Sequence, residues 1–129
     1  MGQVFGSVVL VVAAMFGLLT AWMAATSPER FASQLGLEVA GSSGRNEVRA
    51  QYAGFFLAAA LVCVAALAGF APRQAAFLLL CAAFGGCIAG RLASLVANRG
   101  FGGYTTLIRA LFAIDAIGFL AGAAAFATS

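Results

Sequence analysis

The chain has 129 residues, of which 64% are hydrophobic and only 9% are charged. A soluble domain usually carries about 25% charged residues, and a fold of this size cannot hide so much apolar surface from water. The formal net charge of +3 comes from seven Arg against four acidic residues, with no Lys and no His. So few scattered charges exclude a nucleic-acid surface, and the commonest acid–base group of neutral pH is missing. We expect one integral membrane domain over residues 1–129.

The residues that most often carry chemistry are sparse and isolated. Cys63, Cys81 and Cys87 each lie within an apolar run and form no C-x-x-C pair, so we expect them to act as small apolar side chains. Ser7 and Ser94 have no His to act as their base. The sequence therefore predicts no catalytic residue, no cofactor and no metal site.

The first predicted span covers about residues 4–25 and contains no charge. About 22 apolar residues are enough to cross a hydrocarbon core of about 30 Å. A signal peptide is the alternative, but no Arg or Lys precedes the run. Trp22, near the end of the span, suits an aromatic anchor at the membrane interface.

Residues 26–45 are polar by comparison with the rest of the chain. Ser27 followed by Pro28 is typical of a helix start, with Ser as the N-cap and Pro in the first turn. We expect a short interfacial helix that ends near Gly36, followed by a flexible link through residues 41–44.

Three further spans are predicted, at about residues 46–70, 74–97 and 104–127. Asn46 suits the N-cap of the second span, which puts Glu47 in its first turn, where the helix dipole favours an anion. The short links after the second and third spans make neighbouring helices antiparallel. The predicted fold is therefore all-α, a four-transmembrane-helix bundle with a short interfacial helix between helices one and two.

Small residues are abundant in the spans, and in membranes they allow helix backbones to approach closely. Two strips are the strongest candidates for close packing. The first is Gly85, Gly86 and Gly90, and the second is Gly118 and Gly122.

The distribution of Arg predicts the orientation of the chain. The links after the first and third spans are richer in Arg, whereas the link between the second and third spans carries only Arg73. Because cytoplasmic loops are enriched in positive charge, the two Arg-richer links are expected in the cytoplasm.

Five polar residues in or at the edges of the spans are candidate binding residues: Glu47, Arg49, Tyr52, Arg91 and Asp115. A rise of about 1.5 Å per residue puts Asp115 deepest, about 16 Å into the fourth span. A bare carboxylate is unfavourable there, so Asp115 is expected to be protonated or to meet an Arg from a neighbouring helix. Arg91 is the first candidate, because it lies on the adjacent span and on the same side of the membrane.

Three interpretations of these residues stay open. They form a structural ion-pair network, or a polar pocket that binds an anionic headgroup or a small polar molecule, or a proton-coupling site at Asp115. All five residues belong to the half of the bundle that faces the two Arg-richer links.

Residues 46–54 resemble the E-x-R-A-x-Y-G-G signature of a bacterial family of small four-helix membrane proteins, which is known only as a domain of unknown function. Residues 85–92 are similar to the G-G…G-R-L stretch of its third helix. Ala53 replaces the first Gly of the signature, and Asp115 stands where the family usually has Glu. The resemblance implies four spans and a role for the five polar residues, but it brings no known activity.

These observations favour a membrane binding module or an accessory subunit over an enzyme that acts on a lipid-soluble substrate, in which Asp115 and Tyr52 would be the candidate acid–base groups. The expected location is the bacterial inner membrane, in a multi-pass arrangement, and the expected partners are membrane lipid and other subunits, either of the same chain or of a larger complex. The alternative is a small proton-coupled transporter that uses Asp115. Four-helix multidrug exporters of this size place their key carboxylate in the first span, and the first span here has none.

Overall fold

The computed structural model describes residues 2–129, and this part of the chain is helical without strands, as predicted. The elements follow in the order α1 (Gly2–Thr26), α2 (Pro28–Gln34), α3 (Gly41–Val48), η1 (Arg49–Gly54), α4 (Phe55–Leu67), α5 (Arg73–Ala97) and α6 (Thr106–Ala127). η1 is a short π-helix that joins α3 to α4, so that these three elements form one continuous rod. Four helices are long and apolar enough, by length and composition, to cross a membrane: α1, the α3–η1–α4 rod, α5 and α6.

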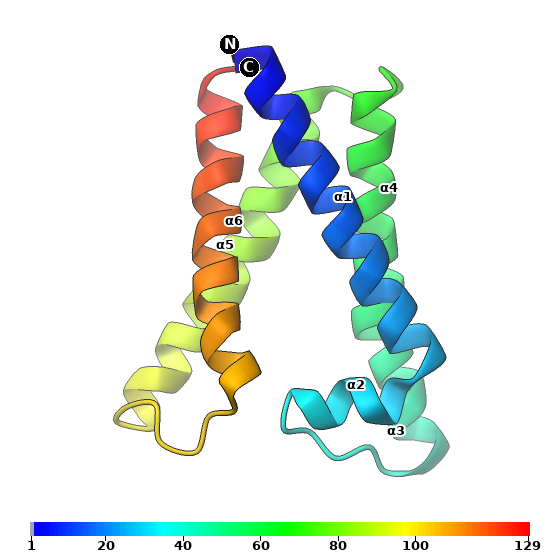
Figure 1. The fold of residues 1–129 in the computed structure, drawn as a ribbon, viewed down its shortest axis with the longest axis vertical. Helices are drawn as coiled ribbons and strands as arrows, with labels where there is room; N and C mark the ends of the chain where they lie inside the picture. Colours follow the sequence, from blue (N-terminus) through cyan, green and yellow to red (C-terminus); the bar gives the residue numbers. More distant parts are fainter. Residues whose placement is uncertain (1) are drawn as a thin grey trace.

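The four long helices form two antiparallel pairs, α1 with the α3–η1–α4 rod and α5 with α6 (Figure 1). The pairs meet at the end that holds the start of α1, the end of α6 and the α4–α5 link, and they diverge toward the opposite end. α2 lies across that opposite end, beside α3. The predicted four-helix bundle is confirmed, and its shape is that of a V rather than a parallel-sided bundle.

The main core lies where the two pairs meet. Its buried residues come from all four long helices: Leu10, Ala14, Cys63, Ala66, Ala76, Phe77, Leu80 and Ala125. Phe77, Leu10 and Cys63 are its largest fully buried side chains. Farther along the V, the rings of Phe16 and Phe84 are 6.2 Å apart between centroids. The core therefore joins the pairs along one half of their length.

α2 begins and ends as the sequence predicts. Ser27 occupies the N-cap position and Pro28 the first helical position. Gly36 follows the helix with a φ of 76°, a conformation that L side chains rarely adopt. The Leu37 N–H donates to the Ala32 carbonyl, and the Gly36 N–H donates to the Ser33 carbonyl. These two bonds form a Schellman motif that ends the helix and turns the chain toward α3.

The expectation of a flexible link at residues 41–44 is wrong, since these residues form the first turn of α3. Asn46 is consequently inside the helix, Ala40 is the N-cap residue, and Glu47 lies in the second turn rather than the first. The physical reason is packing. Val48 is buried in a second cluster with Ala24 and Ala32, and burial of this kind overrides the low helix propensity of Gly and Ser.

Three of the glycines predicted to allow close packing lie at the contact between α5 and α6: Gly85, Gly118 and Gly122. A Cβ atom on Gly118 would stand 2.7 Å from the ring of Phe84. The expectation fails for Gly86 and Gly90, where a Cβ atom would meet nothing within 4 Å among the described residues. Gly86 and Gly90 share a helix face that points away from the α5–α6 contact.

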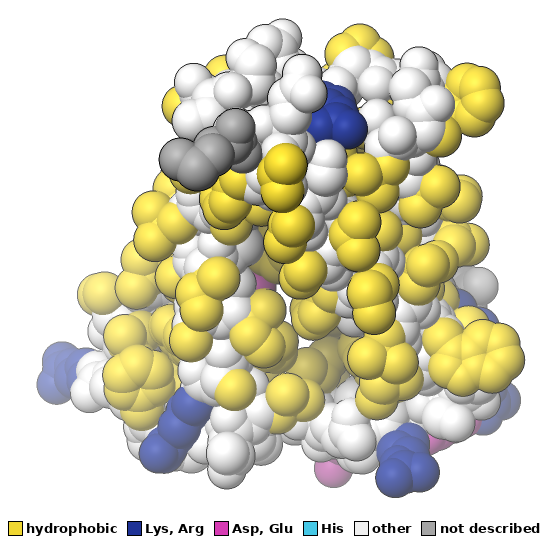
Figure 2. Space-filling model, turned by 45° about the horizontal axis from the view of Figure 1, so that its top comes forward, with side chains coloured by type: hydrophobic (Ala, Val, Ile, Leu, Met, Phe, Trp, Pro, Cys, Tyr) yellow, Lys and Arg dark blue, Asp and Glu magenta, His cyan; other side chains and the backbone are white. Residues whose placement is uncertain are grey.

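Charge is distributed unevenly along the molecule (Figure 2). Arg73 stands at the closed end of the V. The other charged side chains belong to α2, α3, η1 and the links around them, or to the parts of α5 and α6 near their shared link. The polar end of the molecule is therefore the open end of the V.

Candidate functional site

An ion pair joins α5 to α6 inside the V. The Nε–H of Arg91 donates to Oδ2 of Asp115 at 2.5 Å. Asp115 is buried, with 5% of its surface exposed, whereas the Arg91 side chain is 23% exposed. A buried carboxylate is costly unless it is paired and hydrogen-bonded, and Arg91 meets both needs. The predicted pairing of these two residues is confirmed.

A pocket of about 340 Å³ opens beside this ion pair. Its wall combines the chain that follows α2 with the facing parts of α5, α6 and their link: Leu35, Gly36, Arg91, Ser94, Gly103, Tyr104, Thr105, Ile108 and Phe112. The space-filling view shows a hollow between the two helix pairs (Figure 2). The pocket therefore lies in the diverging half of the V, at its polar end.

Three polar side chains near the pocket form a hydrogen-bonded cluster. The Tyr104 hydroxyl lies 3.0 Å from the Ser94 hydroxyl, and the Asn98 side-chain amide donates to it at 3.0 Å. Sequence reasoning missed Tyr104 and considered Ser94 only as a nucleophile. The sequence does contain a signal for Ser94 as a pocket residue, because Ser94 follows Arg91 by three positions and so shares its helix face.

The pocket combines hydrogen-bond donors with an apolar wall. Asp115 accepts from the Nε–H of Arg91. The two terminal amino groups of this guanidinium, and the hydroxyls of Ser94 and Tyr104, are therefore suited to bind acceptor oxygens of a ligand. The guanidinium carbon also lies 6.0 Å from the centroid of the Phe112 ring, which holds it by a cation–π contact. Leu35 and Ile108 supply apolar surface. Such a lining suits an amphipathic molecule with an acceptor group.

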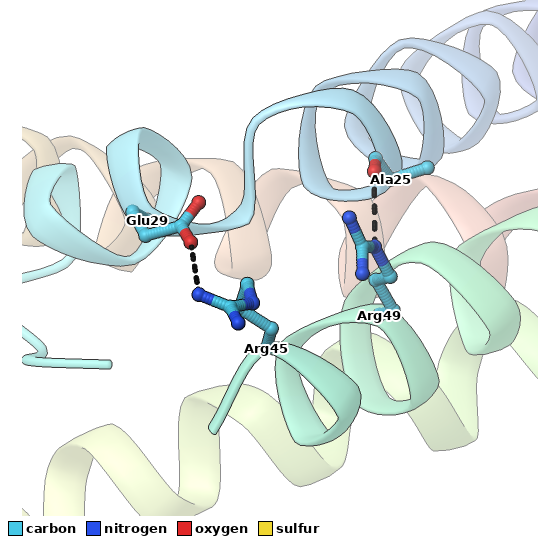
Figure 3. A network of polar contacts seen from close by, with 4 residues as sticks. All are labelled: Ala25, Glu29, Arg45 and Arg49. Atoms are coloured by element: carbon cyan, nitrogen blue, oxygen red, sulfur yellow. Dashed lines mark hydrogen bonds and ion pairs between the residues drawn. The ribbon is translucent and has the colours of Figure 1, made fainter. Parts of the chain in front are cut away.

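The other predicted site residues lie on the opposite arm of the V, in α3 and η1. The Nε–H of Arg49 donates to the carbonyl of Ala25 at 3.2 Å, near the end of α1 (Figure 3). The ring of Tyr52 packs on that of Phe31 in α2, with 5.1 Å between centroids. Glu47 is exposed, and no side-chain hydrogen bond or ion pair involves it in the described part of the chain. The five residues thus form two separate groups.

Arg49 and Tyr52 contact the segments that lead to the pocket rather than the pocket itself. Their contacts hold α2 and the end of α1 against the second span. Beyond α2, Leu35 and Gly36 form one wall of the pocket, and the hydroxyl of Thr105 donates to the Gln34 carbonyl at 3.4 Å. Arg49 and Tyr52 therefore contact the chain that precedes one wall of the pocket, and neither of them lines it.

A surface ion pair adds to the attachment of α2. Arg45 in α3 lies 3.3 Å from Glu29 in the first turn of α2 (Figure 3). A hydrogen bond from the backbone of Glu29 lowers the pKa of this carboxyl below its usual value, and Arg45 lowers the pKa further. The carboxylate form is thus the one that contributes to the fold.

Within residues 2–129, no group of three or more His, Cys, Asp or Glu side chains is placed to hold a metal ion. The residues that the structure gathers are donors for hydrogen bonds, and they are arranged around a cavity.

Fold and composition together define a small multi-pass membrane protein. The chain belongs to the family described as a domain of unknown function, DUF4345, which matches residues 6–113. The matched segment includes Arg91 and the residues of η1, and it ends two positions before Asp115. No curated protein and no solved structure gave a match.

Proposed function

We propose that this protein is a non-catalytic binding module of the membrane, and that its ligand occupies the pocket between α2 and the α5–α6 pair. One observation carries the proposal. Arg91, which is paired with Asp115, lines a cavity of about 340 Å³ together with Ser94 and Tyr104. A purely structural ion pair would need no such cavity beside it, and intramembrane charges commonly mark functional sites.

The lining indicates the chemical class of the ligand. Arg91 and the hydroxyls favour acceptor oxygens, as in a carbonyl, a carboxylate or a phosphodiester. Asp115 already neutralises Arg91, so a dianion would find no net positive charge in the pocket. The ligand is therefore neutral or singly charged at its head and apolar elsewhere, as is the headgroup region of a membrane lipid.

The protein's surroundings are part of the same proposal. The proposed location is the inner membrane of a bacterium, and the Arg-richer links support an orientation with the open end of the V in the cytoplasm. The pocket then opens at the level of the cytoplasmic headgroups. A second copy of the chain or a larger membrane complex receives the ligand or depends on its presence.

Native mass spectrometry after extraction in a gentle detergent tests the proposal. The wild type should carry a co-purified molecule that is depleted in Tyr104→Phe and in Ser94→Ala, because both changes remove a hydroxyl and keep the ion pair. Arg99→Gln alters an exposed charge in the same link and should retain the molecule. Equal ligand content in all four proteins would refute the binding site.

Transport by Asp115 is the competing function, and the depth of this carboxylate is what favours it. The Arg91 partner argues against it, since a proton carrier must lose its counter-ion in each cycle. Proton flux into liposomes that depends on an added substrate and disappears in Asp115→Asn would replace the binding module with a transporter.

A further inference from the structure

A second depression lies at the closed end of the V, far from the pocket just described. It has a volume of about 430 Å³ and is bordered by one face of α1 and the first residue of α5: Gln3, Val4, Ser7, Val8, Val11, Val12 and Arg73. Nothing in the proposed binding function uses these residues. The depression is open at the side, so a molecule that lies in it would also contact the surrounding lipid.

One end of this depression is cationic. Arg73 starts α5, and one of its terminal amines donates to the Gln3 carbonyl at 3.3 Å. This bond fixes the guanidinium beside α1 and uses one of its five N–H groups. No other Arg, Asp or Glu occurs at this end of the described chain. An anion that approaches here meets a held cation with no acidic side chain beside it among the described residues.

The rest of the depression is an apolar wall that runs toward the middle of the membrane. Val4, Val8, Val11 and Val12 are exposed to between 43% and 70%. Their spacing of three to four residues places them on neighbouring rows of one helix face, over a length of about 12 Å at about 1.5 Å per residue. β-branched side chains hold few rotamers, so this wall is smooth and stiff.

We infer that this depression binds one phospholipid molecule of the leaflet opposite to the pocket. The lipid's phosphodiester accepts hydrogen bonds from Arg73, and one acyl chain lies along the valine face. A cation at interface height and an apolar strip toward the midplane reproduce the polarity of such a lipid along the membrane normal. A phosphate group without acyl chains would interact only with Arg73, and a neutral lipid would interact only with the valine face.

Retention of defined lipids in native mass spectrometry tests the inference. The purified protein is delipidated and then given phosphatidylglycerol or diacylglycerol with the same chains. One phosphatidylglycerol per chain should be retained, and Arg73→Gln should reduce its retention about tenfold, the effect of losing one charge-assisted hydrogen bond. Arg30→Gln removes an exposed Arg at the other end and should retain the lipid as the wild type does.

A second variant separates lipid loss from misfolding. Val8→Trp blocks the groove from an exposed position and leaves Arg73 in place, so it should also lose the lipid. Retention of phosphatidylglycerol in both variants, or equal retention of diacylglycerol by the wild type, would overturn the inference. Tyr104→Phe leaves this site intact, so a failure of the pocket and a failure of the lipid site are distinguished in one data set.

Discussion

Asp115 occupies a position where a lipid-spanning helix would ordinarily carry Ala or Leu. It is tolerated because α5 brings Arg91 to it, and because both side chains face the interior of the V rather than the acyl chains. In a medium of low polarity the two charges attract strongly, but each has lost its hydration. The net stabilisation by such a pair is small, whereas removal of one partner leaves a buried charge uncompensated.

This asymmetry gives the first prediction. Asp115→Leu should lower the free energy of unfolding by about 3 kcal/mol, because Arg91 then remains charged and unpaired. The double variant Arg91→Leu and Asp115→Leu should recover most of the loss. Thermal unfolding in dodecyl maltoside measures both. A double variant that is less stable than Asp115→Leu would contradict this, because it would show that Arg91 stabilises the fold through contacts other than the ion pair, such as the one with Phe112.

Glu29 gives a prediction about pH. Its backbone hydrogen bond and Arg45 lower its pKa in the folded protein relative to the ordinary value of 4.5. The stabilisation is therefore fully present above pH 4.5 and is lost as the pH falls through the lower, folded-state pKa. Below that point the protection factors of α2 should fall in the wild type, once measured exchange rates are corrected for the pH dependence of intrinsic exchange. In Glu29→Gln this contribution to the pH dependence should be missing, and identical pH profiles would contradict the assignment.

At the scale of elements, η1 determines where α2 sits. A π-helix widens the turn, and such turns are often found at functional sites. Here it carries Arg49, whose guanidinium meets a carbonyl near the C-terminal end of α1, where the helix dipole also favours a cation. Tyr52, on the same short element, packs on Phe31. One contact from this element therefore joins α2 to the second span, and the other joins the end of α1, which leads directly into α2.

The role of Arg49 is tested against its neighbour Glu47. Arg49→Gln should weaken the attachment of the end of α1 by about 1 kcal/mol, the usual contribution of one hydrogen bond, and thereby raise hydrogen exchange in the adjoining residues 28–37 about fivefold. Glu47→Gln changes a charge two positions away that has no described partner, so its exchange should match the wild type. Equal effects of the two substitutions would remove the positioning role.

Contacts between helices depend on glycine in one place and not in another. A Cβ atom on Gly17 in α1 would stand 2.9 Å from the backbone carbonyl oxygen of Phe56, whereas one on Gly86 meets nothing within 4 Å. Backbone cannot move aside cheaply, so Gly17→Ala should destabilise the protein by about 1 to 3 kcal/mol. Gly86→Ala should be neutral or stabilise by up to about 1 kcal/mol, because Ala favours a helix. The free energies of unfolding of the two variants, measured in a series of detergent mixtures, test this difference.

For the whole molecule, the sequence predicts which segments span the membrane better than it predicts how they are arranged. Spans follow from length and apolarity, and the start and end of α2 follow from Ser27, Pro28 and Gly36. The Arg91–Asp115 pair follows from the cost of a buried charge. The separation of Arg49 from that pair does not, since depth in the membrane says nothing about which arm of the V holds a residue. The sequence does not indicate Tyr104 for the same reason, because Tyr104 meets Ser94 and Asn98 only in the folded chain.

The V shape has a consequence for motion. At the closed end, the core with Leu10 and Phe77 joins all four long helices. At the open end, the arms are joined between α2 and α6 by a hydrogen bond of 3.4 Å from Thr105 to Gln34. Few buried contacts and exposed hydrogen bonds mark the parts of a protein that open most readily. The open end should therefore fluctuate while the closed end stays fixed, which would let a ligand pass Leu35 into the pocket.

Distances between spin labels measure this difference. In a background without native cysteines, one pair of labels at Ser33 and Thr106 spans the open end, and a matched pair at Phe5 and Gln74 spans the closed end; all four positions are exposed. The distance distribution across the open end should be the broader of the two, and it should narrow when ligand binds, because the ligand contacts both arms. Equal widths at the two ends would mean that the packing near Phe16 and Phe84 already holds the arms together, and that the pocket is filled without movement of α2.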